Sequence, residues 1–579
     1  MTSQRARQEG VSPPLQLSPI EGERVAGERA PLVINVGLVG AGVVGSAVLD
    51  YFAAEPLEMY VPGARFGEPT VARVRLYSVA RRSRGTGKGA LPAYVESLVT
   101  RDAQGRPRFF YDSDGSGGGP GPAWRQVVHD DEVDIVVEVT GSPVAGAVIE
   151  EALWSGKCVV TANKTVISRS GYELVKLAQS RGAILAYEAA VGGGMPIVQT
   201  IASSIGGRVT AMLAIINGTT NFILTRMREA AERGGDSRAA YPAAVCAAIH
   251  GGLAESDPGA DVLGQDAQSK IILLAGLAFG VRLRPKDVYV RGIARRAIHQ
   301  ESPGMDRAAY HDCPGGSPCA DMCGKDDHLG TAPVLHVPDL QVLERLGYVP
   351  KLLAGAQAIR NAETGADERI VAWVQPTAVP LGHALAGVEG SQNACLLQVE
   401  SPSREIPGPF GKPFEVLLRG PGAGGPETAS SVMADVLFCA RQIAAARRSA
   451  AAGEGEGARA SLYMYGSNAF GWEQAYEGTA SILASDALVA PFLLRFIAGA
   501  RRANGIGLTL GRHGVEAAQV AGVRGQSDYL YFKTAPASLR AVESALEAVQ
   551  KQQGAARMPL DVLYLPLLEG AAWEEAGRA

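Results

Sequence analysis

The chain has 579 residues, which at roughly 150 residues per domain predicts three or four domains. Its net charge of −4 gives no electrostatic reason to bind nucleic acid or an acidic membrane. The seven cysteines are an odd number, and no apolar run approaches the roughly 18 residues of a membrane span, so a disulfide framework and a membrane anchor are both disfavoured. We expect a protein of the cytoplasm, or of a plastid if the source is a photosynthetic eukaryote.

The first 30 residues are polar and aperiodic, which predicts a disordered tail. From Pro31 the pattern is a strand, a glycine-rich turn and a helix, followed by further strands separated by helical stretches (Val71–Val79, Ile135–Val139, Cys158–Thr161 and Ile184–Tyr187). This alternation predicts a parallel, doubly wound α/β sheet, that is, a Rossmann-type dinucleotide-binding domain over residues 31–187.

The first turn carries the pattern GxGxxG between a buried strand and a helix, and its residues are Gly40, Ala41, Gly42, Val43, Val44 and Gly45. The glycines allow backbone N–H groups to approach a pyrophosphate at the helix N-terminus. The alternative is a glycine-rich turn that binds nothing. In this strand–turn–helix context the motif favours a dinucleotide.

The next strand ends in Arg81 and Arg82 instead of an acidic residue. An acid there would bind a ribose 2′-hydroxyl, whereas arginine suits a 2′-phosphate. The sequence therefore favours NADP(H) over NAD(H). Two solvated arginines, with NAD(H) as cofactor, are the alternative.

Three later segments carry chemistry. VTANK ends a strand with Lys164, EAAVGGGMP forms another strand exit at residues 188–196, and GGLAESDP leads to the acids and the lysine of the next helix (Asp261, Asp266, Lys270). Carboxylates around a lysine suit a small zwitterion. An ordinary helix N-terminus with an i,i+4 ion pair explains the last segment equally well.

Six motifs taken together resemble the homoserine dehydrogenases in content and order: GAGVVGSA, VTANK, EAAVGGGMPI, INGTTNFIL, GLAESDPGADVLGQDAQSK and GPGAGGPETAS. The resemblance covers roughly residues 33–440, and no aspartokinase-sized region precedes it, as in the monofunctional form. It implies NAD(P)H-dependent interconversion of L-aspartate 4-semialdehyde and L-homoserine in threonine, methionine and isoleucine biosynthesis. A dehydrogenase of another small amino aldehyde, or an inactive amino-acid sensor on this fold, is the alternative.

The resemblance also implies roles for single residues. Lys270 is expected to be the proton donor, Glu255 to contact the substrate amino group with Asp261 and Asp266 in support, and Lys164 to reach the cofactor near the reacting centre. Thr140 and Gly424 are expected to complete the nucleotide pocket. Backbone carbonyls are expected to bind a monovalent cation such as sodium (Glu188, Val191, Gly193 and Met195).

The implied architecture has an α+β catalytic and dimerisation domain over residues 188–411, while residues 412–443 complete the first domain. A linker at 444–460 and an ACT-like α+β regulatory module at 461–579 follow. We expect a homodimer or homotetramer. Every reaction motif precedes Ala444, so the C-terminal module is predicted to be dispensable for catalysis.

One insertion, residues 298–333, has no counterpart in the resemblance. It carries three cysteines and two histidines (His311, Cys313, Cys319, Cys323 and His328). Their spacings are not those of a zinc finger, which favours a loop with free thiols over a metal site.

Overall fold

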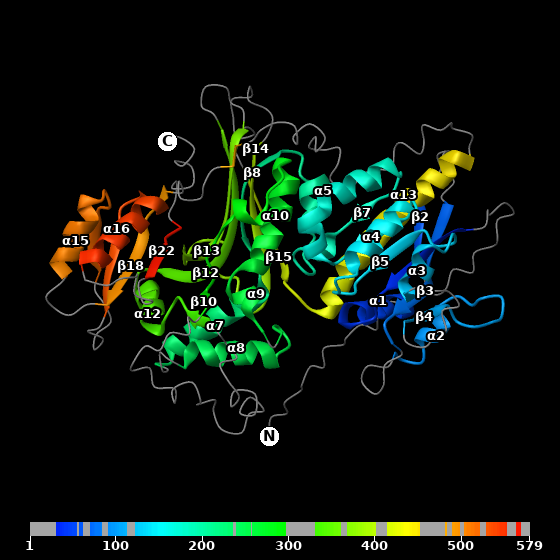
Figure 1. Ribbon diagram of the computed structural model, residues 1–579, viewed down its shortest axis with the longest axis horizontal. Helices are drawn as coiled ribbons and strands as arrows, with labels where there is room; N and C mark the ends of the chain where they lie inside the picture. Colours follow the sequence, from blue (N-terminus) through cyan, green and yellow to red (C-terminus); the bar gives the residue numbers. More distant parts are fainter. Residues whose placement is uncertain are drawn as a thin grey trace, which may run out of the picture.

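The computed structural model describes residues 31–54, 57–61, 70–83, 91–112, 122–234, 239–255, 257–296, 331–360, 367–400, 414–451, 481–482, 489–497, 503–520, 529–552 and 563–568. The predicted N-terminal tail and the cysteine–histidine segment 311–328 lie outside these residues. Figure 1 shows three parts in a row: a first sheet with its helices, a second sheet in the middle, and a small C-terminal module.

The first sheet has the order β2-β3-β1-β5-β6-β7. Its core strands are parallel and mostly buried and aliphatic, apart from the exposed Arg73 and Arg75: β1 (Leu32–Val39), β3 (Thr70–Arg81), β5 (Ile135–Glu138), β6 (Cys158–Thr161) and β7 (Leu185–Ala186). Such runs are typical of strands covered on both faces. The covering helices include α1 (Val43–Ala54), α3 (Ala123–Val128), α4 (Ala145–Trp154) and α5 (Lys164–Ser180). The predicted Rossmann-type fold is confirmed.

Three short elements extend this domain beyond the prediction. Strand β2 (Leu57–Val61) pairs antiparallel with β3, β4 (Phe109–Tyr111) pairs parallel with β3, and α2 (Val95–Leu98) lies between β3 and β4 in the chain. The insertion of β2 explains the long interval between the glycine turn and Arg81.

A long helix, α13 (Gly425–Ala451), packs against α1 and the first sheet (Figure 1). Its buried residues recur every three or four positions (Ala429, Val432, Met433, Val436, Cys439, Ala440 and Ala444). The predicted linker is therefore wrong in its first half: the run AAARRSAA continues the helix to Ala451, since alanine and arginine are strong helix formers. Among the described helices, Gly425–Arg448 alone is long and apolar enough to cross a membrane, but half of it is buried inside the protein, as in a core helix.

The second sheet has the order β15-β14-β8-β12-β13-β16, with β9 beside β13. Its strands are β8 (Arg208–Ile215), β9 (Tyr289–Val290), β12 (Tyr348–Arg360), β13 (Asp367–Pro380), β14 (Gln392–Glu400), β15 (Phe414–Pro421) and β16 (Ser481–Ile482). Strand β15 pairs antiparallel with β14. Residues 412–443 were expected to complete the first domain. Helix α13 packs on the sheet of that domain, whereas the ladder with β14 places β15 in the second sheet, so the expectation is wrong for β15.

Helices α7 (Gly218–Glu232), α10 (Gln265–Phe279) and α12 (Val337–Arg345) pack on this sheet. Between and beside them lie η2 (Glu188–Ala190), α6 (Ile197–Gln199), η3 (Thr200–Ser204), α8 (Ala240–His250), α9 (Gly259–Val262) and η4 (Pro285–Asp287). Strands β10 (Ala294–Arg296) and β11 (Thr331–Pro333) form a separate antiparallel pair. Helix α10 begins at Gln265, so both Asp266 and Lys270 lie on it.

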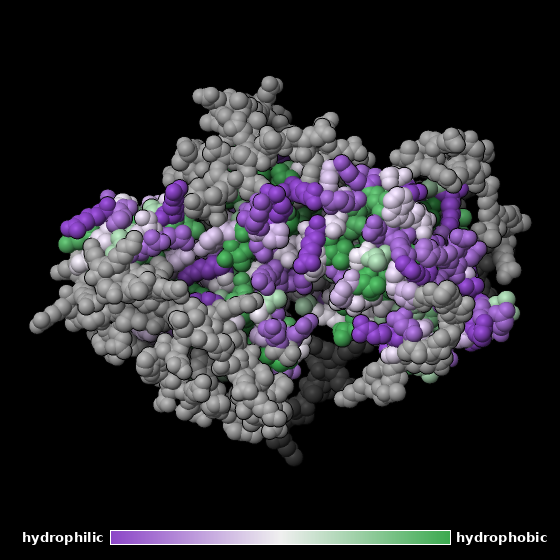
Figure 2. Space-filling model, viewed as in Figure 1, coloured by the Kyte–Doolittle hydropathy of each residue, from purple (hydrophilic) through white to green (hydrophobic). Residues whose placement is uncertain are grey.

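The C-terminal module follows a βαββαβ path: β18 (Phe492–Ile497), α15 (Ala503–Arg512), β19 (Ala517–Val520), β20 (Tyr529–Thr534), α16 (Leu539–Gln552) and β22 (Leu563–Pro566). Its antiparallel sheet has the order β19-β20-β18-β22, and β17 (Val489–Ala490) pairs with β21 (Ala537–Ser538). The expected α+β topology is present. Figure 2 shows hydrophilic side chains over much of the visible described surface, with smaller apolar areas between them.

Candidate active site

The glycine turn between β1 and α1 has the backbone geometry that its sequence predicts. Gly40 has a φ of 101°, a conformation open to glycine, and a Cβ on Gly45 would lie 2.2 Å from the Gly40 carbonyl oxygen. Around Gly42 there is open space, so a ligand can approach the backbone there. The first turn of α1 contains no acid, which leaves the positive end of the helix dipole available to a phosphate.

Strand order places two predicted cofactor residues, Arg81 and Thr140, beside this turn. Strand β1 lies between β3 and β5, so the connections leave β1 in opposite directions and create the switch point where α/β sheets bind ligands. Arg81 follows Ala80, whose carbonyl accepts a hydrogen bond from Gly40 N (2.9 Å). Thr140 follows β5 on the other side.

The loop before α13 returns to the glycine turn. A Cβ on Gly425 would lie 2.9 Å from Val43 Cγ1, and one on Gly424 would lie 2.0 Å from the Glu427 carboxylate. Gly424 also has a φ of 134°, which favours glycine. The sequence predicted this approach of two distant segments from the motif GPGAGG, and the structure brings them together.

Two lysines share one buried carboxylate at the junction of the two sheets. Lys164 Nζ lies 2.6 Å from Asp266 Oδ1, and Lys270 Nζ lies 2.8 Å from Asp266 Oδ2. Lys164 stands at the N-terminus of α5 and Lys270 on α10, so the cluster joins the first domain to the second. The Lys164 side chain is 40% exposed, whereas Lys270 is buried and also donates to the Ile216 carbonyl oxygen (2.8 Å).

The charges of this cluster stabilise one another. Burial acts to raise the pKa of the Asp266 carboxyl, but the ammonium groups of Lys270 and Lys164 outweigh it and hold the pKa well below its usual range. Burial acts to lower the pKa of Lys164, yet the carboxylates of Asp266, Asp261 and Glu255 raise it overall. Burial raises the pKa of Asp261, and the Asp266 carboxylate adds to that shift. In this cluster the pKa of the Asp261 carboxyl is therefore raised while that of the neighbouring Asp266 carboxyl is lowered.

Asn217 is a site residue that the sequence analysis did not single out. Its Nδ2 donates to Asp261 Oδ1 (2.7 Å) and to Asp266 Oδ2 (2.9 Å), while its Oδ1 accepts from Thr220 N (2.7 Å) and caps α7. One amide thus fixes two of the predicted substrate carboxylates. The motif INGTTNFIL contains this residue, and an asparagine before a helix is the N-cap signal that could have found it.

The loop of Glu255 is held by the same motif. Thr219 Oγ1 donates to the Leu253 carbonyl oxygen (2.7 Å), two residues before Glu255. Glu255 itself is exposed, and its negative charge contributes to the raised pKa of Lys164. It therefore lies at the solvent side of the cluster, where an incoming substrate would first meet it.

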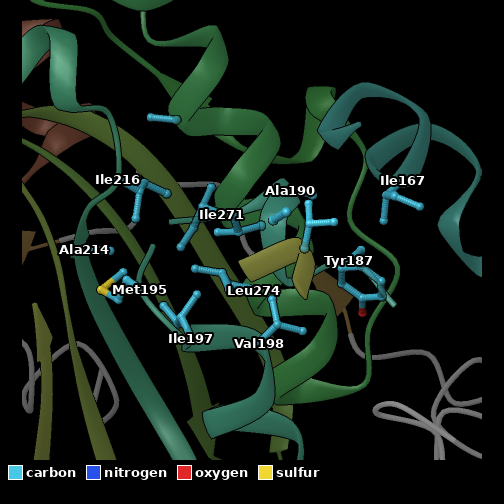
Figure 3. Close-up of a cluster of buried hydrophobic side chains, with 14 of the residues drawn as sticks. Ile167, Tyr187, Ala190, Met195, Ile197, Val198, Ala214, Ile216, Ile271 and Leu274 are labelled. Atoms are coloured by element: carbon cyan, nitrogen blue, oxygen red, sulfur yellow. The ribbon is translucent and has the colours of Figure 1, made fainter. Parts of the chain in front are cut away.

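An apolar layer lies beneath the polar cluster. Figure 3 shows Ile216 from the end of β8, Ile271 and Leu274 from α10, and Met195 and Ile197 from the loop around α6, all in one packed group. Ile216 carries the carbonyl that accepts from Lys270, and Ile271 follows Lys270 directly. This packing fixes the backbone on both sides of the buried lysine, because close-packed cores allow little movement.

The segment 188–196 forms a compact buried loop. The Gly193 carbonyl accepts from Ser431 Oγ (2.6 Å), the Met195 carbonyl from Ile197 N (2.8 Å), and the Glu188 carbonyl from Val191 N (3.2 Å). The Glu188 carboxylate accepts from the Val198 and Gln199 amides (both 2.8 Å). Each carbonyl oxygen has a second lone pair.

The structure thus brings the predicted residues together in two places. Gly40 to Gly45, Arg81, Thr140 and Gly424 gather at the switch point, and Lys164 connects them to Glu255, Asp261, Asp266 and Lys270. The carbonyl loop at 188–195 is a third, separate feature. Among the described residues, no group of three or more histidine, cysteine, aspartate or glutamate side chains could hold a metal.

Comparison with known proteins agrees with this geometry. The family description "Homoserine dehydrogenase, NAD binding domain" matches residues 40–188, and "Homoserine dehydrogenase" matches residues 196–437. A homoserine dehydrogenase of Corynebacterium glutamicum is 33% identical over 411 residues, 70% of this chain and 72% of that protein. One of Mycobacterium tuberculosis is 32% identical over 421 residues, 72% of this chain and 74% of that protein.

A solved structure shows a similar fold. The crystal structure of a homoserine dehydrogenase from Thiobacillus denitrificans has a TM-score of 0.63 and 24% identity, and the alignment covers 93% of this chain and 98% of that one. None of these matches favours an amino-acid sensor or a dehydrogenase of another amino aldehyde. Motifs, geometry and relatives agree, and the chain belongs to the homoserine dehydrogenase family.

Proposed function

We propose that the cluster of Lys164, Asp266 and Lys270 is where this NAD(P)-dependent oxidoreductase interconverts L-aspartate 4-semialdehyde and L-homoserine. The observation that supports this assignment is the sharing of one buried carboxylate by two lysines from different domains, next to the nucleotide turn. A cofactor bound at the switch point and a substrate bound on the second sheet would meet at that position.

Lys270 is the proposed proton donor. Two of its three N–H groups are directed at Asp266 and at the Ile216 carbonyl, which leaves the third for the substrate oxygen. In the reducing direction the nicotinamide supplies the hydride to the aldehyde carbon, and Lys270 protonates the resulting alkoxide. In reverse, the neutral amine takes the proton of the hydroxyl. Lys164 stabilises negative charge at the same oxygen from the cofactor side.

The substrate ammonium is proposed to bind the acidic side of the cluster. Glu255 is exposed at its rim, and Asp261 is held by Asn217 behind it. Because burial and Asp266 raise the pKa of Asp261, an arriving ammonium would favour its charged form. Asp266 is already neutralised by two lysines, so we assign it to orienting them.

The cofactor is proposed to be NADP(H). The open space at Gly42 fits a pyrophosphate against the start of α1. Pairing of Val39 with Ala80 sets Arg81 and Arg82 directly beside that turn, where a 2′-phosphate would lie. NAD(H) is the weaker candidate, since no acid follows β3 in the position that binds a ribose 2′-hydroxyl.

A monovalent cation, preferably sodium, is proposed to bind the carbonyls of Glu188, Val191, Gly193 and Met195. Left-handed Gly192 and Gly193 (φ 84° and 63°) bend this loop sharply, and a carbonyl oxygen can accept a second interaction beside one hydrogen bond. Hard cations prefer such oxygen ligands. Replacing sodium with choline should lower both the melting temperature and activity; an unchanged melting temperature would count against the site.

We also propose a homodimer or homotetramer in the cytoplasm. Phe414 and Leu417 are exposed on β15, an edge strand of the second sheet, and such an edge favours pairing with another chain. Light scattering of the purified protein gives the oligomeric state, and a monomer would contradict this part of the proposal.

A spectrophotometric assay tests the assignment. Purified protein should reduce NADP in the presence of L-homoserine, and Asp266→Asn should abolish most of that rate while leaving NADPH binding measurable by fluorescence. Activity retained in Asp266→Asn would show that the reaction takes place elsewhere.

A further inference from the structure

A buried carboxylate at the switch point has no role in the reaction described so far. Glu138 is the last residue of β5 and its side chain is 0% exposed. Strand β5 pairs with β1 on one side and with β6 on the other, with Val39 and Thr161 opposite Glu138. The side chain therefore lies in the sheet edge between the nucleotide turn and the strand that leads to Lys164.

One oxygen of Glu138 holds the loop after β5. Glu138 Oε1 accepts from Thr140 N (2.8 Å) and Thr140 Oγ1 (2.6 Å). Thr140 Oγ1 in turn accepts from Ser142 N (3.2 Å). These bonds fix the turn through Gly141, which contains the proposed nucleotide contact Thr140.

The other oxygen holds the loop after β6. Glu138 Oε2 accepts from Thr161 Oγ1 (2.7 Å), and Thr161 Oγ1 accepts from Asn163 N (3.0 Å). Asn163 caps α5 by accepting from Val166 N (3.1 Å), and the next residue is Lys164. A chain of three hydrogen bonds thus runs from Glu138 to the start of the helix that presents Lys164.

We propose that Glu138 is a positioning residue that couples the cofactor loop to the lysine loop. A single rigid carboxylate sets the distance between Thr140, which faces the nucleotide, and Lys164, which faces the reacting oxygen. Among the described residues, Glu138 accepts hydrogen bonds from one backbone amide and two hydroxyl groups, so both of its oxygens bind these two loops. The inference rests on the roles proposed above for Thr140 and Lys164.

The side-chain chemistry explains why glutamate is used. A carboxylate offers acceptor sites on both oxygens, whereas glutamine of the same shape offers one acceptor and one donor. Glutamine would present its NH₂ either to the Thr140 donors, which then lose their acceptor, or to Thr161 Oγ1, which must then accept where it now donates. In either orientation a bond of the present network is lost or reversed and the negative charge is removed, while the core volume stays unchanged.

The first test is Glu138→Gln, and the control is Glu58→Gln, an exposed glutamate on strand β2 of the same sheet. We expect Glu138→Gln to raise the Kd for NADPH by roughly tenfold or more, as expected for loss of a charged hydrogen bond in a buried site, and to lower kcat. Glu58→Gln should change neither. Unchanged Kd and kcat in Glu138→Gln, even with a lower melting temperature, would show a merely structural role and overturn the proposal.

A mutant cycle tests the coupling itself. NADPH affinity is measured for Thr140→Val, Thr161→Val and the double variant. With Glu138 present, the fold-change in the Kd for NADPH of the double variant should differ from the product of the two single fold-changes by roughly threefold or more. In the Glu138→Gln background, the double variant should show the product of the two single effects. Additivity with Glu138 present would overturn the coupling.

Rescue by a conservative change separates folding from positioning. Thr161→Ser keeps the hydroxyl and should restore the kcat that Thr161→Val loses, and this pair decides the question if Glu138→Gln fails to fold. Wild-type oxidation of homoserine is measured alongside. A wild-type protein without that activity would refute the proposed function, whereas an active wild type with a silent Thr161→Val would refute only the role of Glu138.

Discussion

Asp266 holds two lysines at once, and the roles of those lysines can be separated by substitution. Lys270 is buried and bonded to a backbone carbonyl, whereas Lys164 is partly open to solvent. A buried, fixed ammonium suits proton transfer, because the surrounding core holds it in one geometry. The exposed one suits electrostatic stabilisation of a ligand that enters and leaves.

Lys270→Ala should lower turnover by roughly 10²- to 10⁴-fold, as for other positioned acid–base groups. The affinity for NADPH should stay near that of the wild type, since Lys270 belongs to the second domain. Steady-state kinetics and a fluorescence titration measure the two quantities. Near-normal turnover would transfer the role of acid to Lys164.

Glu255→Ala provides the contrast for this experiment. Removal of an exposed partner of the substrate ammonium should raise the KM for homoserine and leave NADPH affinity unchanged. If kcat falls as steeply as in Lys270→Ala while KM is constant, Glu255 acts in the chemical step and the assignment to substrate binding is wrong.

Arg81→Asp tests the choice of cofactor. Loss of the cation and addition of a carboxylate beside the glycine turn should raise the KM for NADP while affecting NAD little, because only NADP carries the 2′-phosphate. Arg82→Asp, one residue further along, tests by the same measurement whether the second guanidinium also contacts the 2′-phosphate. Equal effects on both cofactors would exclude a 2′-phosphate contact at Arg81.

At the scale of helices and strands, local patterns predicted most of the first domain. The strand Cys158–Thr161 matches β6 residue for residue, since a short buried aliphatic run bounded by turns has few other solutions. The edge strand β2 was missed, because it is short and pairs antiparallel with β3. Long-range pairings of this kind leave no local signal.

In the candidate site, too, local motifs predicted the single residues but not the contacts between distant segments. Lys164, Asp266 and Lys270 were predicted from motifs, but their sharing of one carboxylate depends on how α5 meets α10, which no local spacing encodes. Asn217 and Glu138 were missed for a related reason. They bind other protein groups, and a side chain that positions its neighbours differs from an ordinary polar residue only once the neighbours are placed.

Strand β12 carries a buried lysine whose titration can be measured. Lys351 donates to Asn221 Oδ1 (3.3 Å) and to the Val388 carbonyl, and burial lowers its pKa from 10.5 to about 8, with the nearby charge of Arg228 adding to the effect. Between these pH values the unfolded chain binds the proton and the folded one does not. Stability should therefore rise with pH over this window, by up to about 3 kcal/mol.

Lys351→Met should lack this rise. Urea unfolding of both proteins at about pH 7.5 and about pH 10 isolates the contribution of the lysine, because the remaining groups titrate alike in both. If the free energy of unfolding changes equally with pH in the wild type and in Lys351→Met, then Lys351 either stays charged throughout or titrates alike in the folded and unfolded states.

At the scale of the whole molecule, a buried ion pair joins the C-terminal module to the catalytic part. Arg495 on β18 pairs with Asp339 on α12, both 0% exposed, and Tyr531 Oη donates to Asp339 Oδ1 (2.9 Å). On the other side of the junction the Arg291 guanidinium lies 3.8 Å from the ring centroid of Tyr564 on β22. The sequence predicted a module that is dispensable for catalysis, and these contacts indicate that it contributes to the stability of the catalytic part.

A protein truncated after Ala451 should therefore be destabilised, since Asp339 loses its buried cation. Arg495→Met should reproduce much of this loss, about 3–5 kcal/mol, because one partner of a buried pair remains uncompensated. Arg73→Met, which removes an exposed ion pair with Glu58, should cost at most about 1 kcal/mol. Chemical denaturation compares the three. A truncated protein as stable as the full chain would show that these contacts contribute little to stability.

The packing of α13 on the first sheet has a consequence for synthesis on the ribosome. The strands of that sheet are complete by residue 186, but the helix that covers one of its faces ends only at Ala451. At a translation rate of about 5–20 residues per second, α13 is complete roughly 13–50 s after the last strand of the sheet. During that interval its aliphatic face is open to chaperones and to neighbouring chains, so the yield of active enzyme should depend on the speed of translation between these two points.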